Sequence, residues 1–295
     1  MDHFHRFEPT EQDKVKPLAA GGVVVRLIFM ITVVFMLALG GRTAIAQEGL
    51  VDLELIIAVD ISGSVDDDEA HLQRQGYIKA FRDPKVVEAI KSGPLGAIAV
   101  TYFEWAGSHH QLTLVDWSFI NSEQTANEFA DALAFEPVMV NVWTSISGAI
   151  LAGVDNFARS PFKGKRRVID ISGDGANNDG PPVNLVRDQA LKTGITINGL
   201  PIVNDKPSRY GRKQIPNLDY YYIDCVIGGP GAFIIVANGF EDYARAVRRK
   251  LILEIAGLQP AQQPGKPQTG FIPAYGELRP PCNVGENLRQ DWDDF

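Results

Sequence analysis

The sequence predicts an α/β fold built on a doubly wound, mostly parallel sheet. The run from Leu53 to Val59 is almost continuously apolar, which is typical of a strand covered by helices on both faces of its sheet. A second apolar run, from Arg167 to Ser172, follows two segments whose apolar residues recur at helical spacing. Buried strands that alternate with amphipathic helices indicate a parallel sheet.

The remaining elements follow in order along the chain. Four acidic residues, Asp66 to Glu69, predict a helix start, because negative charge stabilises the positive end of a helix dipole. Two strands joined by a short loop, Gly96–Phe103 and Gln111–Trp117, predict an antiparallel hairpin at a sheet edge. Apolar periodicity predicts the rest: helices in residues 126–133, 146–157, 183–192 and 240–255, and strands in residues 195–203 and 233–236.

The N-terminal 46 residues predict a signal peptide. Basic residues precede an uncharged apolar stretch that is shorter than the roughly 20 residues of a bilayer span. Ala44 and Ala46 then give the small residues of a cleavage site, so we expect cleavage near Ala46 and no transmembrane span in the mature chain. The alternative is an uncleaved membrane tether.

Two other segments lack a regular pattern. Residues 204–231 form a long insertion rich in Tyr, Pro and Gly, which is typical of a functional loop, with a packing lid as the alternative. Residues 258–295 are rich in Pro and Gln at their start and show no periodicity, which predicts a mostly disordered tail. The globular domain is therefore expected over residues 47–257.

Charge and cysteine content restrict the function. The formal net charge is −8, and the densest basic cluster, Lys163 to Arg167, directly precedes an apolar strand, so nucleic acid is not an expected partner. Cys225 and Cys282 are the only cysteines. In an oxidising compartment they can form one disulfide; alternatively, Cys225 is buried and Cys282 is an idle thiol.

Oxygen-bearing side chains lie where the predicted strands end. Asp60, Ser62 and Ser64 follow the first apolar strand directly. Thr144 lies just before a helix, and Asp174 follows the second apolar strand. Doubly wound sheets bind ligands at the carboxyl ends of their strands, so these side chains are expected to meet. Two carboxylates and three hydroxyls suit Mg²⁺, Mn²⁺ or Ca²⁺ and argue against Zn²⁺ or copper.

The composition of this set also suggests how an ion would be held. We expect Ser62, Ser64 and Thr144 to bind Mg²⁺ directly, and Asp60 and Asp174 to act largely through water. An ion with so little directly bound negative charge stays electrophilic and keeps a position open for an external carboxylate.

The D-x-S-x-S stretch at Asp60, together with Thr144 and Asp174, resembles the metal-ion-dependent adhesion site of von Willebrand factor type A domains. The stretches IIAVDISGSVDDDE, RRVIDISGDGANNDG and CVIGGPGAF are similar to a bacterial exported group known as domain of unknown function 1194. The resemblance implies a sheet of about six strands with one antiparallel edge strand, and binding through the metal. It also implies a periplasmic or secreted bacterial protein.

These observations predict an exported, cation-dependent protein-binding module, in which Mg²⁺ or Mn²⁺ captures an Asp or Glu of a partner. Asn177, Asn178 and Asp179 are expected to contact that partner, together with the Tyr-rich insertion around Tyr220 to Tyr222. The alternatives are a metal-dependent hydrolase and a structural envelope scaffold with a relic metal site. The H-E-x-x-H, G-x-S-x-G and phosphate-loop motifs are missing from the sequence, which favours a binding protein over an enzyme.

Overall fold

A computed structural model describes residues 49–204, 206, 207, 211, 213–260 and 279–293. The predicted signal peptide and its cleavage near Ala46 lie outside these residues. Within the described part of the chain, no helix is long and apolar enough to cross a membrane.

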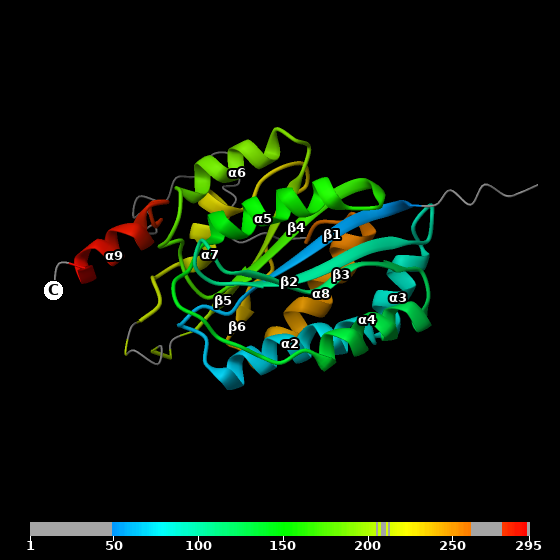
Figure 1. The fold of residues 1–295 in the computed structure, drawn as a ribbon, viewed down its shortest axis with the longest axis horizontal. Helices are drawn as coiled ribbons and strands as arrows, with labels where there is room; N and C mark the ends of the chain where they lie inside the picture. The colour runs from blue at the N-terminus through cyan, green and yellow to red at the C-terminus, as the bar shows by residue number, and fades with distance from the viewer. Residues whose placement is uncertain (1–48, 205, 208–210, 212, 261–278, 294–295) are drawn as a thin grey trace, which may run out of the picture. The chain divides into compact units, whose positions relative to one another are not determined.

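One six-stranded sheet forms the centre of the molecule, with the strand order β3-β2-β1-β4-β5-β6 (Figure 1). The edge strand β3 runs antiparallel to β2, and the other neighbours are parallel. This arrangement confirms the predicted fold class. The strands are β1 (Leu50–Asp60), β2 (Ile98–Trp105), β3 (Gln111–Ile120), β4 (Lys163–Gly173), β5 (Thr196–Val203) and β6 (Ala237–Asn238).

Helices cover both faces of the sheet (Figure 1). Alternate residues of β1 point to opposite faces, so Leu55 and Ile57 join one apolar core while Ile56 and Ala58 join the other. The first core is completed by α2 (Asp67–Phe81), α3 (Pro84–Lys91), α4 (Glu123–Phe135) and α8 (Tyr243–Ala256). The second is completed by α5 (Ile146–Arg159), α6 (Val183–Leu191), α7 (Leu218–Tyr221) and the π-helix η1 (Tyr222–Val226).

Local signals in the sequence explain where the helices begin and end. Asp66 caps α2 by accepting from the Glu69 amide at 2.9 Å, while Glu69 accepts from the Asp66 amide at 2.9 Å. The acidic run therefore begins a helix, as predicted. At the other end of the domain, Gly257 stops α8 with a left-handed φ of 67°.

Two segments differ from the prediction. Residues 233–236 were expected to form a strand, but Ile234 makes only an isolated bridge to Gly199, and β6 follows as a two-residue strand. Residues 284–293, within the predicted disordered tail, form the helix α9 (Val284–Asp293). A disulfide and several polar contacts described below hold α9, and none of these can be read from apolar periodicity.

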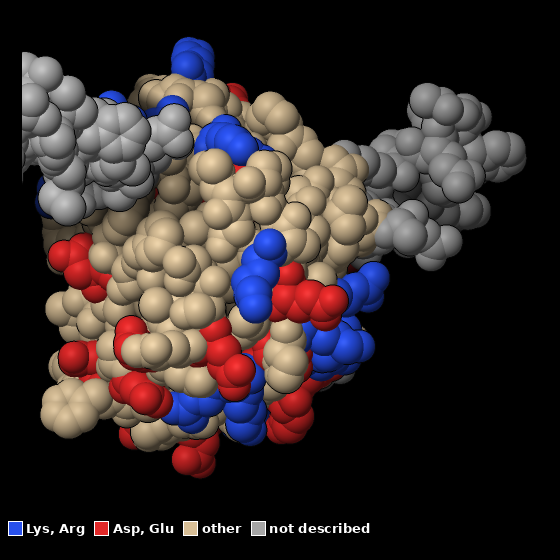
Figure 2. Space-filling model, turned by 90° about the vertical axis from the view of Figure 1, so that its right-hand side faces the viewer, with Lys and Arg blue, Asp and Glu red and all other residues tan. Residues whose placement is uncertain are grey.

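At the end of the molecule where β1 begins, the described residues visible in Figure 2 form no single-sign charge patch. Lys and Arg side chains are interspersed there with Asp and Glu. Such a mixed surface lacks the basic stripe that phosphate backbones require.

Candidate functional site

The end of β1 holds its polar residues in a tight turn. Asp60 and Ser62 are both fully buried. Asp60 Oδ1 accepts a hydrogen bond from the Ser62 amide at 2.7 Å, and Gln73 Nε2 donates to the Asp60 carbonyl at 2.9 Å. The Asp60 carboxylate is therefore held at the carboxyl end of the sheet.

Three loops bring the predicted metal ligands together. Ser62 Oγ lies 3.1 Å from Ser64 Oγ, and Ser64 Oγ donates to Asp174 Oδ1 at 2.5 Å. Asn178 joins the loop that carries Thr144 to this group. The Asn178 backbone N–H donates to the Thr144 carbonyl at 2.8 Å, and the Asn178 side-chain Oδ1 accepts from the Thr144 backbone N–H at 2.9 Å. We call Asp60, Ser62, Ser64, Thr144 and Asp174 the cation site.

Gly173 allows the close approach of β4 to this group. A Cβ atom at residue 173 would lie 2.8 Å from Asp60 Oδ2 and 2.9 Å from the Tyr222 hydroxyl. Neither atom can move easily, because both residues are completely buried. Glycine is thus required where the strand passes the Asp60 carboxylate.

Burial makes the charged forms of both aspartates unfavourable in the metal-free protein. It raises the pKa of Asp60 well above the ordinary value, and the nearby Asp174 raises that pKa further. Burial raises the pKa of Asp174 to about 6, with an opposing effect from its hydrogen bond to Ser64 and a further increase from Glu69. No salt bridge among the described residues involves either carboxylate.

The geometry fits a hard divalent cation. Asp60 Oδ2 is buried and has no hydrogen-bond partner within the described chain. The 3.1 Å between the Ser62 and Ser64 hydroxyls matches neighbouring ligands in an octahedral shell, which lie about 3.0 Å apart when each is about 2.1 Å from Mg²⁺. The described residues contain no group of three His, Cys, Asp or Glu able to hold a metal, so hydroxyl oxygens would complete this shell.

The three residues expected to contact a partner, Asn177, Asn178 and Asp179, differ in burial and in their contacts. Asn177 is fully buried and donates from Nδ2 to Glu286 Oε1 at 2.8 Å, while its Oδ1 accepts from the Ser147 amide at 2.9 Å. Asn178 lines the cleft beside the cation site. Asp179 accepts hydrogen bonds from the Ser108 amide and from Arg289. Of the three, only Asn178 is among the residues that line the cleft.

The Tyr-rich insertion also lies mainly inside the protein. Tyr221 and Tyr222 are completely buried in the second core, so these two side chains cannot contact a partner. Tyr221 donates its hydroxyl to the Cys282 carbonyl at 3.4 Å and accepts from the Asn177 amide at 3.1 Å. This correction to the prediction follows from α7 and η1, which turn the aromatic rings toward the sheet.

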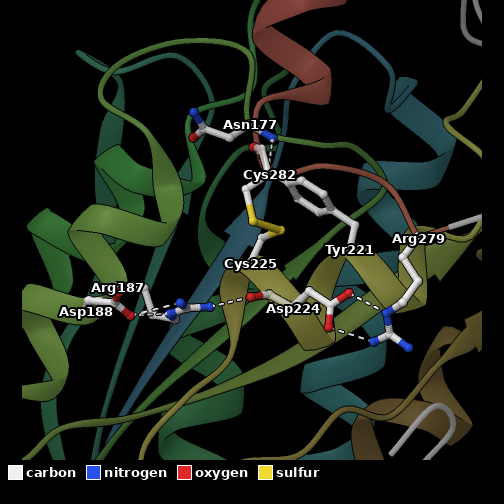
Figure 3. Close-up of a disulfide and its surroundings, with 8 residues drawn as sticks. All are labelled: Asn177, Arg187, Asp188, Tyr221, Asp224, Cys225, Arg279 and Cys282. Atoms are coloured by element: carbon white, nitrogen blue, oxygen red, sulfur yellow. Dashed lines mark hydrogen bonds and ion pairs between the residues drawn. A yellow bond between two sulfur atoms is a disulfide. The ribbon is translucent and has the colours of Figure 1, made fainter.

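A disulfide joins the insertion to the C-terminal segment (Figure 3). Cys225 in η1 and Cys282 are bonded, with their Cα atoms 5.4 Å apart. Nearby, Arg279 makes two hydrogen bonds of 2.6 Å to the Asp224 carboxylate. Of the two alternatives for the cysteines, the structure contains the disulfide.

A cleft of about 270 Å³ opens beside Ser64, Thr144 and Asp174. Sequence reasoning placed no apolar surface there, because the residues come from distant parts of the chain. The cleft's apolar and basic lining includes Val142, Trp143, Ile215, Leu288, Lys206 and Lys213.

Sequence reasoning also missed a buried charged group beneath the sheet. Lys250 of α8 is completely buried and pairs with Asp170 of β4 and with Glu254 at 2.5 Å. Asn198 donates to Glu254 Oε1 at 2.8 Å. We call these four residues the Lys250 cluster. Because lysine is rarely buried, a lysine in a helix is ordinarily expected at the surface, and the sequence gives no distinctive signal that Lys250 is buried.

The domain described above is matched, over residues 50–259, by a family whose description reads "Protein of unknown function (DUF1194)". The chain belongs to this family. No curated protein matches it in sequence. The six-stranded, mostly parallel α/β sheet is the one that the sequence predicted. The matched region ends before Cys282 and α9.

Solved structures are similar in fold. Proximal thread matrix protein 1 from the mussel byssus, with a zinc-occupied MIDAS motif, has a TM-score of 0.52 at 13% identity and covers 72% of this chain. The match spans about half of that mussel protein, 49% of its length. A von Willebrand factor type A structure from Catenulispora acidiphila has a TM-score of 0.47 at 13% identity, covering 70% of this chain and 43% of its own. The pilus adhesin SpaC from Lactobacillus rhamnosus GG has a TM-score of 0.49 at 12% identity, and the match covers 70% of this chain and 31% of SpaC.

Proposed function

We propose that this chain is a cation-dependent protein-binding module, in which Mg²⁺ or Mn²⁺ at the cation site captures an Asp or Glu carboxylate of a partner. The observation that carries the proposal is the buried Asp60 Oδ2, which has no hydrogen-bond partner and no salt bridge among the described residues. A buried carboxylate oxygen without a partner is costly, and a cation would remove that cost.

The residues of the cation site would divide the task of holding the ion. Ser62, Ser64 and Thr144 offer neutral hydroxyl oxygens, while Asp60 and Asp174 supply the negative charge. When bound, the ion supplies a localised positive charge that attracts an anionic oxygen. The hydrogen bonds from Asn178 to Thr144 fix the loop that carries one of these hydroxyls.

Binding is favoured over catalysis by the lining of the cleft. Among its described lining residues there is no His, Cys or Glu to act as a general base. Lys206 is paired with Asp66 at 2.9 Å and with Glu69 at 3.1 Å. A mussel protein of similar fold has a zinc-occupied MIDAS motif, which supports metal binding by a domain of this fold.

We also propose that the mature chain is exported and is periplasmic or secreted. The disulfide between Cys225 and Cys282 supports this location, because disulfides persist in oxidising compartments.

Mn²⁺ relaxivity tests the proposed function directly. Bound Mn²⁺ with open positions should enhance water-proton relaxation, and acetyl-glutamate amide should lower that enhancement by displacing water. Ser64→Ala should weaken Mn²⁺ binding at least about tenfold, as loss of an outer partner of a metal ligand already does. Ser92→Ala, at an exposed serine after α3, is the matched control and should bind normally. Unchanged binding in the Ser64 variant would refute the assigned site.

A further inference from the structure

The C-terminal helix α9 forms one wall of the cleft beside the cation site. Gly285 and Leu288 of α9 line the cleft, together with Thr144 and Asp174 of the cation site. Leu288 remains 37% exposed, so its side chain has room for a further apolar contact.

Close contacts hold α9 in this place. A Cβ atom at Gly285 would lie 2.1 Å from the Asn177 carbonyl oxygen, so the helix touches the loop that follows Asp174. Arg289 donates to Asp179 Oδ1 at 2.6 Å and to the Asn178 carbonyl at 3.1 Å.

The same helix fixes the loop before Thr144. The Arg289 guanidinium lies 3.9 Å from the centre of the Trp143 ring. Trp143 has a left-handed φ of 65°, which is rare for a bulky residue and persists only where the surroundings hold it. Through these contacts, α9 connects two of the loops that carry the cation site.

The disulfide anchors the start of this wall. Cys282 lies two residues before α9, and its bond to Cys225 ties the segment to η1 in the second core. The ion pair of Arg279 with Asp224 adds a second attachment on the same side (Figure 3).

The size and lining of the cleft indicate what it can hold. A volume of about 270 Å³ lies just below the roughly 300–1,000 Å³ of small-ligand pockets, so it suits one or two side chains rather than a flat protein face. Apolar lining beside Leu288 comes from Val142, Trp143 and Ile215. Lys213 adds a positive charge to the same cleft, which complements an acidic ligand.

We propose that the cleft binds an extended acidic peptide segment of a partner, with its carboxylate at the cation and the adjacent apolar side chain against Leu288. The helix α9, anchored by the disulfide, selects for that apolar side chain. This inference rests on the proposed function, because the carboxylate is placed by the cation.

The experiment measures binding of fluorescent acetyl-Gly-Asp-Leu-Gly amide to the full mature chain in Mg²⁺ by anisotropy. Replacing the Leu of the peptide by Gly should weaken binding about tenfold, the effect of losing one buried apolar side chain. Replacing the Asp by Asn, or adding EDTA, should abolish binding.

Protein variants then test the wall. Leu288→Ala should remove most of the preference for Leu over Gly, and the double variant Cys225→Ser with Cys282→Ser should do the same. Leu151→Ala is the matched control, because Leu151 is a 44% exposed leucine on α5 that does not line the cleft. Normal Mn²⁺ affinity in each variant shows that the cation site has folded.

The outcomes separate this inference from the proposed function. If the Leu and Gly peptides bind wild-type protein equally well and only in Mg²⁺, the apolar wall is refuted while carboxylate capture stands. If Mn²⁺ binds but no Asp peptide does, and the protein stays monomeric in Mg²⁺, both proposals fail. Mg²⁺-dependent dimerisation in sedimentation velocity, with no peptide binding, would identify a second copy as the occupant and overturn the peptide proposal.

Discussion

Two pairs of buried carboxyl groups lie at the sheet, and the described chain provides a cation for only one. In the Lys250 cluster, Asp170 and Glu254 share the ammonium group of a fully buried lysine. In the cation site, Asp60 and Asp174 are buried as well, but no lysine or arginine among the described residues pairs with them.

The difference shows that burial alone does not assign a role to a carboxylate. Burial and Glu254 raise the pKa of Asp170 to about 7, and Lys250 opposes this increase. For Asp60, burial and Asp174 raise the pKa, and the effects that lower it come from hydrogen bonds rather than from a cation. The described chain supplies a buried cation to the first group and none to the second.

The largest expected effect comes from removing the internal cation. Lys250→Met should lower the free energy of unfolding by about 3–5 kcal/mol, because it leaves two buried carboxyl groups without their partner. Lys165→Met, which breaks a 3.3 Å pair with Asp52 at a lysine that is 53% exposed, should cost less than about 1 kcal/mol. Urea unfolding measures both, and equal small losses would show that the Lys250 cluster needs no cation.

An Asp→Asn substitution should change the free energy of unfolding in opposite directions in the two groups when EDTA removes metal ions. Asp170→Asn should lower the free energy of unfolding by roughly 2 kcal/mol, since Lys250 loses one of its two carboxylate partners. Asp60→Asn should raise it by up to about 1 kcal/mol, since the repulsion from Asp174 disappears while an amide oxygen can still accept from Ser62. Destabilisation by both variants would contradict the contrast between the groups.

The contrast also predicts a pH dependence of Mg²⁺ stabilisation. The pKa of Asp174 is about 6 in the folded protein and 3.8 ordinarily, so its folded form binds the proton more tightly. In the metal-free protein this contribution to stability is fully present below about pH 3.8 and is lost as the pH rises through about 6.

Mg²⁺ binds the ionised carboxylate, so its affinity should fall at least about tenfold for each pH unit below about 6. The shift in melting temperature caused by Mg²⁺ should therefore be large near pH 7 and small near pH 5. Scans with NaCl at matched ionic strength provide the control. A Mg²⁺ shift that does not change with pH would mean that Asp174 takes no part in binding.

The sequence predicts the sheet and the meeting of the three loops because both depend on simple rules. Apolar strands with intervening helices give a parallel sheet, and the carboxyl ends of its strands lie together. For this reason Ser64 and Asp174, 110 residues apart, are hydrogen-bonded in the structure. Whether they hold an ion stays a prediction.

Other features depend on pairings that no periodicity reveals. Lys250 was not placed on the buried face of α8, because its cost of burial is offset by Asp170 from a distant strand. The position of α9 depends on a disulfide between residues 57 apart in the sequence and on a glycine seated against a carbonyl. Asn177 was expected at the surface, but it is fully buried, and its side-chain amide donates to Glu286 of α9.

The disulfide-anchored helix also sets an order of assembly. Residues 279–293 follow all six strands in the chain, so they emerge from the ribosome after every residue of the cation site. Residues 49–257 contain every proposed ligand of the cation, whereas the covalent anchor of the outer wall of the cleft forms only when Cys282 is oxidised onto Cys225. Under the proposed function, ion binding and partner selection would then be acquired at separate stages in the life of the molecule.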